Sequence, residues 1–145
     1  RGPALASGLV GAATGNSEGF RDGWYYTGDL AALGADGFLY LRGRATDMIL
    51  RGGSNVHPDE IEAVLAEHPS VAEAAVVGRP SRELGEEVVA FAVLRDDVNA
   101  EALIDHCRKR LTAFKVPCEI ILVPDLPHTS FGKVDRKRLR SSLVS

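Results

Sequence analysis

A lysine near the C-terminus lies in a stretch whose residues favour a flexible loop. The segment Pro127-His128-Thr129-Ser130-Phe131-Gly132-Lys133-Val134 begins with a proline, which closes the preceding apolar run because it has no ladder N–H. Gly132 gives the approach to Lys133 conformational freedom. The lysine ammonium carries three donors on a long stem, so it can bridge oxygens of a carboxylate and a phosphate at once. The alternative is a solvated surface lysine, because most lysines in Gly-Lys pairs lie on the protein surface.

The elements that must position this loop are expected to form a small α+β domain. Apolar and β-branched runs predict strands over 23–27, 38–41, 48–50, 71–77, 87–94 and 120–123. Helical spacing, a proline near one start and an Asn99 cap near another predict helices over 57–67, 100–113 and 135–143. Sharp turns are expected at 35–37 and 51–54. From residue 44 onward the order is β-α-β-β-α-β-α, with helices against a short sheet.

Composition narrows the class of protein. The chain has 145 residues, 45% hydrophobic and 26% charged, which predicts a packed core. It has no apolar run near the roughly 20 residues of a membrane helix and no visible leader, so a cytoplasmic protein is expected. The net charge of -3 argues against nucleic acid as a partner, and the basic run over 136–140 is interpreted as a solvated helix face. Cys107 and Cys118 lack metal-ligand spacing and are expected to be reduced.

Five motifs follow one another in a characteristic order. They are Thr27-Gly28-Asp29-Leu30, Gly43-Arg44-x-x-Asp47, Gly52-Gly53-Ser54-Asn55-Val56-His57-Pro58-Asp59-Glu60-Ile61-Glu62, Ala113-Phe114-Lys115-Val116-Pro117 and Gly132-Lys133. In this order and spacing the chain resembles the adenylate-forming superfamily, which comprises acyl-CoA synthetases, amino-acid adenylation domains and luciferase-like enzymes. The resemblance covers essentially all of the sequence.

The resemblance implies a division of the chain into two parts. Residues 1–43 would be the β-rich end of a large N-terminal adenylation domain, and residues 44–145 a whole mobile C-terminal domain. The phosphate loop, the acyl pocket and most of the Mg²⁺ site of such enzymes lie upstream, in a missing N-terminal domain. Because the chain opens at Arg1 and its only methionine is Met48, we expect a fragment of a longer protein. The fragment alone is expected to be inactive.

The same resemblance implies a role for each motif in adenylation. Asp29 would accept hydrogen bonds from the ribose hydroxyls of ATP, and Arg44 would contact the ribose or a phosphate. The alternatives are a turn aspartate and a surface arginine. Thr46 stands at the hinge position, where the family usually has Asp or Lys; a hinge needs only to absorb torsion change, so rotation can survive. Lys133 would bridge the substrate carboxylate and the α-phosphate, and would matter little after the domain has swung away.

Two further residues are implied in the CoA tunnel. Gly53 matches the glycine that lets the pantetheine arm pass close to the backbone. The alternative interpretation is an ordinary turn glycine with positive φ. Phe114 stands where members of the family often have an aromatic residue that stacks on the adenine of CoA. A role as a core aromatic is an equal alternative. Leu84 and Val116 depart from the aromatic and basic residues that some relatives use for CoA.

The function implied is that of a cytosolic acid–CoA ligase. ATP and a carboxylic acid would give acyl-AMP and pyrophosphate, and the CoA thiol would then give the thioester, with Mg²⁺ neutralising the phosphates. The first alternative is an adenylating enzyme that loads an acyl or aminoacyl group onto a carrier protein. The second is a non-catalytic interaction module, against which the presence of both Asp29 and Lys133 argues. The acid is not identified, because the acyl pocket lies outside the chain.

Overall fold

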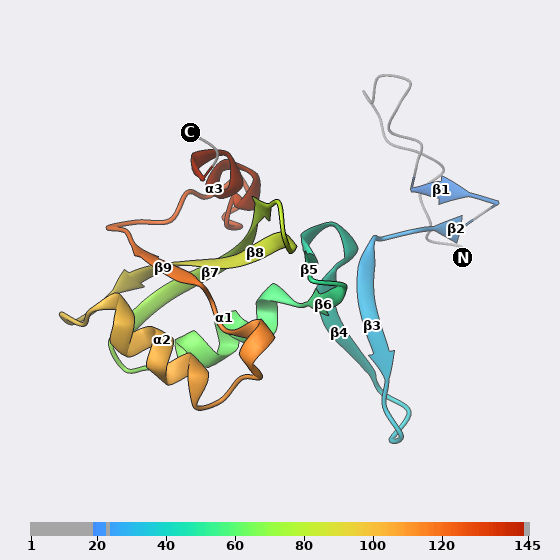
Figure 1. Ribbon diagram of the computed structural model, residues 1–145. Helices are drawn as coiled ribbons and strands as arrows, with labels where there is room; N and C mark the ends of the chain where they lie inside the picture. Colours follow the sequence, from blue (N-terminus) through green and yellow to red (C-terminus); the bar gives the residue numbers. More distant parts are fainter. Residues whose placement is uncertain (1–18, 23, 144–145) are drawn as a thin grey trace. The chain divides into compact units, whose positions relative to one another are not determined.

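The chain forms two compact units that divide between Thr46 and Asp47. The computed structural model describes residues 19–22 and 24–143 (Figure 1). The division falls a few residues after the boundary between residues 43 and 44 that the motifs predict. Residues 1–18 of the expected N-terminal part, and Gly23 of the first expected strand, lie outside the described residues.

The first unit contains two short antiparallel pairs of strands. β1 (Phe20–Arg21) pairs with β2 (Trp24–Tyr25), and β3 (Asp29–Leu33) pairs with β4 (Leu39–Arg44). The expected strand over 23–27 is therefore too long, and Asp29 opens a strand that the sequence suggested it would interrupt. The reason is local: Gly28 has φ 75°, and Ala45 donates its N–H to the Gly28 carbonyl at 2.9 Å. A left-handed residue of this kind ends one extended run and lets another begin.

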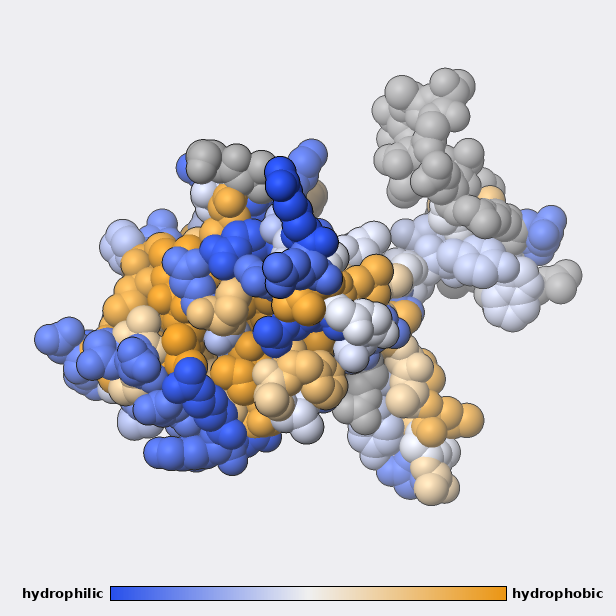
Figure 2. Space-filling model, in the orientation of Figure 1, coloured by the Kyte–Doolittle hydropathy of each residue, from blue (hydrophilic) through white to orange (hydrophobic). Residues whose placement is uncertain are grey.

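Apolar side chains of the β3–β4 hairpin are exposed. Leu33, Phe38 and Leu41 each keep more than two thirds of their surface accessible, and apolar colour marks this hairpin in Figure 2. Among its described residues, the first unit contributes no side chain to a buried hydrophobic core. Exposed apolar side chains grouped in this way are typical of a surface that contacts other protein.

The second unit is built on a five-stranded sheet. Its strands are β5 (Ile49–Arg51), β6 (Ser54–Val56), β7 (Val71–Ser81), β8 (Gly85–Leu94) and β9 (Glu119–Leu122). The order is β6-β5-β8-β7, with β9 parallel to β8 and the other pairs antiparallel. The helices are α1 (Pro58–Ala66), α2 (Ala100–Arg108) and α3 (Arg136–Ser142), with 3₁₀ turns at Ala45–Asp47 and Ala113–Lys115.

Helices cover both faces of this sheet, α1 and α2 on one and α3 on the other (Figure 1). Alternate residues of β7 and β8 enter two separate cores. Val76, Val88 and Ala90 pack with Ile61, Leu65, Leu103 and Cys107 of α1 and α2, whereas Ala75, Val77, Val89 and Phe91 pack with Leu126 and Leu139. These two strands, the longest of the sheet, therefore consist of nearly continuous apolar runs, as strands buried on both faces do. This confirms the expected α+β class, with a short sheet flanked by helices.

Two local expectations differ from the structure. Helix α2 ends at Arg108 rather than 113, because Thr112 has an extended backbone and Ala113–Lys115 form a separate 3₁₀ turn. The expected turn at 51–54 is correct, but strand β6 after it was not expected because its side chains Ser54 and Asn55 are polar. No helix among the described residues is long and apolar enough to cross a membrane.

Candidate functional site

Lys133 lies in a tight turn that its own backbone hydrogen bonds close. His128 and Val134 form an antiparallel bridge at the base. Thr129 donates its N–H to the Lys133 carbonyl at 2.7 Å, and Gly132 donates to the Thr129 carbonyl at 2.9 Å. Gly132 has φ 75°, a conformation that favours glycine. The loop expected to be flexible is thus a defined turn, which we call the lysine turn (residues 128–134).

The lysine side chain is exposed on this turn. Among residues 19–22 and 24–143, no carboxylate forms an ion pair with the Lys133 ammonium. Phe131, two residues earlier, is 91% exposed. A cation held on a defined turn, with no carboxylate partner among the described residues, is accessible to a ligand.

The start of the lysine turn contacts strand β7, and its end leads into helix α3. At its start, Nε2 of His128 lies 2.9 Å from Oε1 of Glu73 in β7. At its end, Asp135 donates its N–H to the Pro127 carbonyl at 2.7 Å, and its side chain caps α3 by accepting from the N–H of Arg138 at 3.0 Å. The bond to Glu73 raises the pKa of His128 above its ordinary value of 6.5.

We expect the contact between His128 and Glu73 to weaken as the pH rises. A raised histidine pKa means that the contribution is fully present below pH 6.5 and is lost as the pH passes the folded-state pKa. An NMR titration should give His128 a pKa above 6.5, and Glu73→Gln should lower it toward that value. Glu83→Gln, in the β7–β8 turn, is the control. An unchanged His128 titration in Glu73→Gln would show that the pair does not form in solution.

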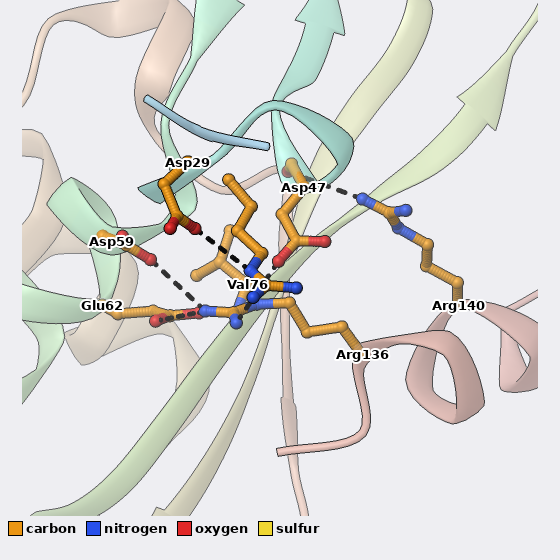
Figure 3. A network of polar contacts seen from close by, with 8 residues as sticks. Asp29, Asp47, Asp59, Glu62, Val76, Arg136 and Arg140 are labelled. Carbon is orange, nitrogen blue, oxygen red and sulfur yellow. Dashed lines mark hydrogen bonds and ion pairs between the residues drawn. The ribbon is translucent and has the colours of Figure 1, made fainter. Parts of the chain in front are cut away.

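The two residues expected at the nucleotide form a cross-strand pair. Asp29 of β3 lies opposite Arg44 of β4, and Nε of Arg44 is 3.3 Å from Oδ1 of Asp29 (Figure 3). Their side chains are 36% and 58% exposed, respectively. An exposed pair of this kind contributes only about 0–1 kcal/mol. Asp29 therefore keeps acceptor capacity for a ligand, and Arg44 can hold its carboxylate in place.

Thr46 is the last residue of the first unit, and Asp47 is the first residue of the second. Both lie in the 3₁₀ turn Ala45–Asp47, which connects β4 to β5. The division of the chain thus coincides with the position that the resemblance assigns to a hinge.

Gly53 belongs to a two-residue hairpin turn between β5 and β6. Arg51 and Ser54 pair across it, and Gly52 and Gly53 have φ values of 55° and 80°. Positive φ at both central residues is typical of a type I′ turn. A Cβ added at Gly53 would meet no atom within 4 Å, so the space beside it is open. Leu84, one of the departures from the family, accepts a hydrogen bond at this turn from the N–H of Gly52 at 2.8 Å.

Phe114 is held close to this turn by a residue that the sequence did not single out. Nη1 of Arg51 donates to the Phe114 carbonyl at 2.6 Å. Lys115 contacts both carboxylate oxygens of Glu60 in α1, at 2.8 and 2.7 Å. Phe114 is 41% exposed as a residue and belongs to neither core, so it is not a core aromatic. The two expected tunnel residues therefore lie in neighbouring segments.

The interpretation of the basic run as a solvated helix face is correct for only part of it. Lys137 and Arg138 are exposed, but the Arg136 side chain is only 24% exposed and faces carboxylates. Nη2 of Arg140 lies 3.5 Å from the Asp47 carbonyl. Residues four apart share one face of a helix. This spacing was the available signal that Arg136 and Arg140 share one face of the helix, and in the structure both contact Asp47.

Comparisons with known proteins agree with this geometry. The family model of the AMP-binding enzyme C-terminal domain matches residues 60–133. The 2-succinylbenzoate–CoA ligase of Bacillus subtilis (strain 168) is 37% identical over 142 residues, covering 98% of this chain and 29% of the relative. A medium/long-chain fatty-acid–CoA ligase of Mycobacterium tuberculosis is 42% identical over 149 residues, covering 97% of this chain and 26% of the relative.

A solved structure shows the same fold. The o-succinylbenzoate CoA synthetase of Bacillus subtilis, in complex with its acyl-adenylate intermediate, superposes with a TM-score of 0.88 at 37% identity. The match covers 97% of this chain and 29% of that one, so the chain spans about three tenths of the length of such relatives. The chain belongs to the AMP-binding enzyme C-terminal domain family, within the adenylate-forming superfamily.

Proposed function

We propose that this chain is the C-terminal part of an ATP-dependent acid–CoA ligase that forms acyl-AMP and then an acyl-CoA thioester. The observation that carries the proposal is the exposed ammonium of Lys133 on a hydrogen-bonded turn, without an ion-pair partner in the described part of the chain. It belongs to a unit that separates from the preceding one at Thr46. A cation so placed can be brought to a reaction centre and taken away again. The two reported relatives, which are 37% and 42% identical to this chain, are CoA ligases.

In the adenylation step, a carboxylate oxygen of the substrate attacks the α-phosphorus of ATP, and pyrophosphate leaves. Lys133 would contact the attacking carboxylate and the α-phosphate, where negative charge builds, and so would lower the barrier. Asp29 would accept hydrogen bonds from the ribose hydroxyls while Arg44 orients its carboxylate. Mg²⁺ would neutralise the departing phosphates and would be held mainly by residues outside this chain.

In the second step, the CoA thiol attacks the acyl carbonyl and AMP leaves. The open space beside Gly53 would admit the pantetheine arm, and the exposed ring of Phe114 would lie beside the nucleotide end of CoA. Arg51 and Lys115 would keep these two segments together. We place the enzyme in the cytoplasm, where its free Cys107 and Cys118 would stay reduced.

Acid-dependent exchange of pyrophosphate into ATP tests this proposal in the full-length protein. Exchange should require a carboxylic acid, and mass spectrometry should then find an acyl-CoA product when free CoA is added. A product found only on a carrier protein would instead support carrier loading. If no acid in a broad panel supported exchange, the chain would belong to a non-catalytic module.

We expect Asp29→Ala to weaken ATP binding in the full-length enzyme. The variant removes hydrogen bonds from a charged acceptor, each of which contributes about 1.5–3 kcal/mol. The KM for ATP should therefore rise about tenfold or more while the KM for CoA stays unchanged. Asp36→Ala, in the turn of the same hairpin, is the control. Equal increases in both KM values would exclude a specific role at the ribose.

A further inference from the structure

Arg136 is the centre of a cluster of charges in the second unit. Its Nη2 lies 2.8 Å from both carboxylate oxygens of Glu62 and 3.4 Å from Oδ1 of Asp59. Its Nη1 lies 3.7 Å from Oδ2 of Asp47 (Figure 3). We call Asp47, Asp59, Glu62 and Arg136 the Arg136 cluster. One guanidinium thus binds two acids of α1 and the first residue after the expected hinge.

The cluster also reaches the sheet. Glu62 accepts the N–H of Val76 at 2.8 Å, so it satisfies a donor of β7, and β7 is an edge strand of the sheet. The side chains of Arg136 and Glu62 are only 24% and 20% exposed. Burial raises the pKa of Glu62, and the neighbouring Arg136 opposes that effect. The guanidinium therefore favours the charged form of the Glu62 carboxylate that it contacts.

The position of Arg136 in the chain connects this cluster to the lysine turn. It is the first residue of α3, directly after the cap residue Asp135, and Asp135 closes the turn through its bond to Pro127. The cluster consequently joins the end of the lysine turn to Asp47, where the unit begins. The contact between His128 and Glu73 fixes the other end of the turn to β7.

We infer that Arg136 is a positioning residue that makes the hinge and the lysine turn move as one rigid body. The inference rests on the proposed function, in which rotation near Thr46 brings Lys133 to the nucleotide. Rotation delivers a side chain accurately only if the segment between hinge and side chain does not bend. A lysine could not replace Arg136 fully, because an ammonium lacks the planar fork that reaches several carboxylates at once.

Half-reaction kinetics of the full-length enzyme test this inference. Arg136→Met should lower acid-dependent pyrophosphate exchange by about 10²-fold, the typical effect of a misplaced catalytic group. Thioester formation from supplied acyl-AMP should stay within about twofold, since that step does not use Lys133. Arg136→Lys should recover part of the exchange activity. Arg138→Met, which changes an exposed side chain of the same helix, is the matched control.

Hydrogen exchange followed by mass spectrometry gives a readout that needs no activity. In Arg136→Met, amides over 128–143 should exchange faster, while those of β8 should stay protected. Equal loss in both half-reactions, or no loss in either, would overturn the inference. An unchanged rate of amide hydrogen exchange over residues 128–143 in Arg136→Met would also overturn the inference. If Arg136→Met does not fold, Glu62→Gln is the second variant, because it keeps the shape of the cluster and removes one charge. It should likewise lower pyrophosphate exchange and leave thioester formation unchanged.

The two proposals fail in different ways. An unmodified enzyme that shows no acid-dependent exchange contradicts the proposed function, and the hydrogen-exchange comparison still decides whether Arg136 holds the lysine turn. An active enzyme in which Arg136→Met behaves like Arg138→Met contradicts the positioning role alone.

Discussion

Lys133→Ala in the full-length enzyme is expected to reduce acyl-AMP formation by roughly 10²–10³-fold, the usual effect of removing one preorganised group that stabilises transition-state charge. Charge builds on the α-phosphate and on the departing pyrophosphate, and the ammonium of Lys133 is the group proposed to meet it. Thioester formation from supplied acyl-AMP should be nearly unaffected. Pyrophosphate exchange measures the first step, and AMP release after mixing acyl-AMP with CoA measures the second.

The control for this variant is Lys137→Ala, which removes an exposed lysine from α3. It should leave both half-reactions unchanged, so that a loss seen in Lys133→Ala is not a general effect of net charge. Equal losses in the two steps for Lys133→Ala would contradict a lysine that acts in only one domain position.

Gly53→Leu is expected to produce the opposite pattern. The leucine side chain would enter the open space beside the β5–β6 turn and obstruct the pantetheine arm, so thioester formation should fall by about 10²-fold or more. Adenylation should be close to normal, because the lysine turn is not involved. The two half-reactions can be measured separately as for Lys133→Ala.

Backbone strain at Gly53 could also explain a loss of activity in Gly53→Leu. Comparing Gly53→Ala with Gly53→Leu separates strain from side-chain volume. Its φ of 80° penalises any side chain, by roughly 1–2 kcal/mol for a left-handed residue. Alanine and leucine carry the same backbone cost, so a smaller effect for Gly53→Ala than for Gly53→Leu would report the volume of the side chain. If both variants slowed adenylation as much as thioester formation, the turn would have only a structural role.

The sequence predicted those parts of the fold that local chemistry determines. Pro58 and the acids after it mark the start of α1, and continuous apolar runs mark β7 and β8 as strands buried on both faces. The Gly132-Lys133 motif identified the lysine turn, although its internal hydrogen bonds were not foreseen. The turn depends on a bridge between His128 and Val134, and no single residue type indicates such a bridge.

Contacts between distant residues could not be predicted in the same way. Asp29 and Arg44 were each selected, but their pairing depends on the register of β3 and β4, which shifts between Leu30 and Ala31. The basic run predicts a solvated position for Arg136, because its carboxylate partner Glu62 is 74 residues away in the sequence. Its helical spacing to Arg140 indicated a shared face but not which surface that face would meet.

A structure of the full-length protein with a bound acyl-adenylate analogue tests the central claim most directly. The account predicts a conformation in which Nζ of Lys133 lies about 3 Å from an oxygen of the α-phosphate. Adding CoA should move the lysine turn away and bring the Gly53 turn toward the acyl group. A complex in which Lys133 stays far from the phosphate, while another cation of the protein occupies that place, would contradict the account.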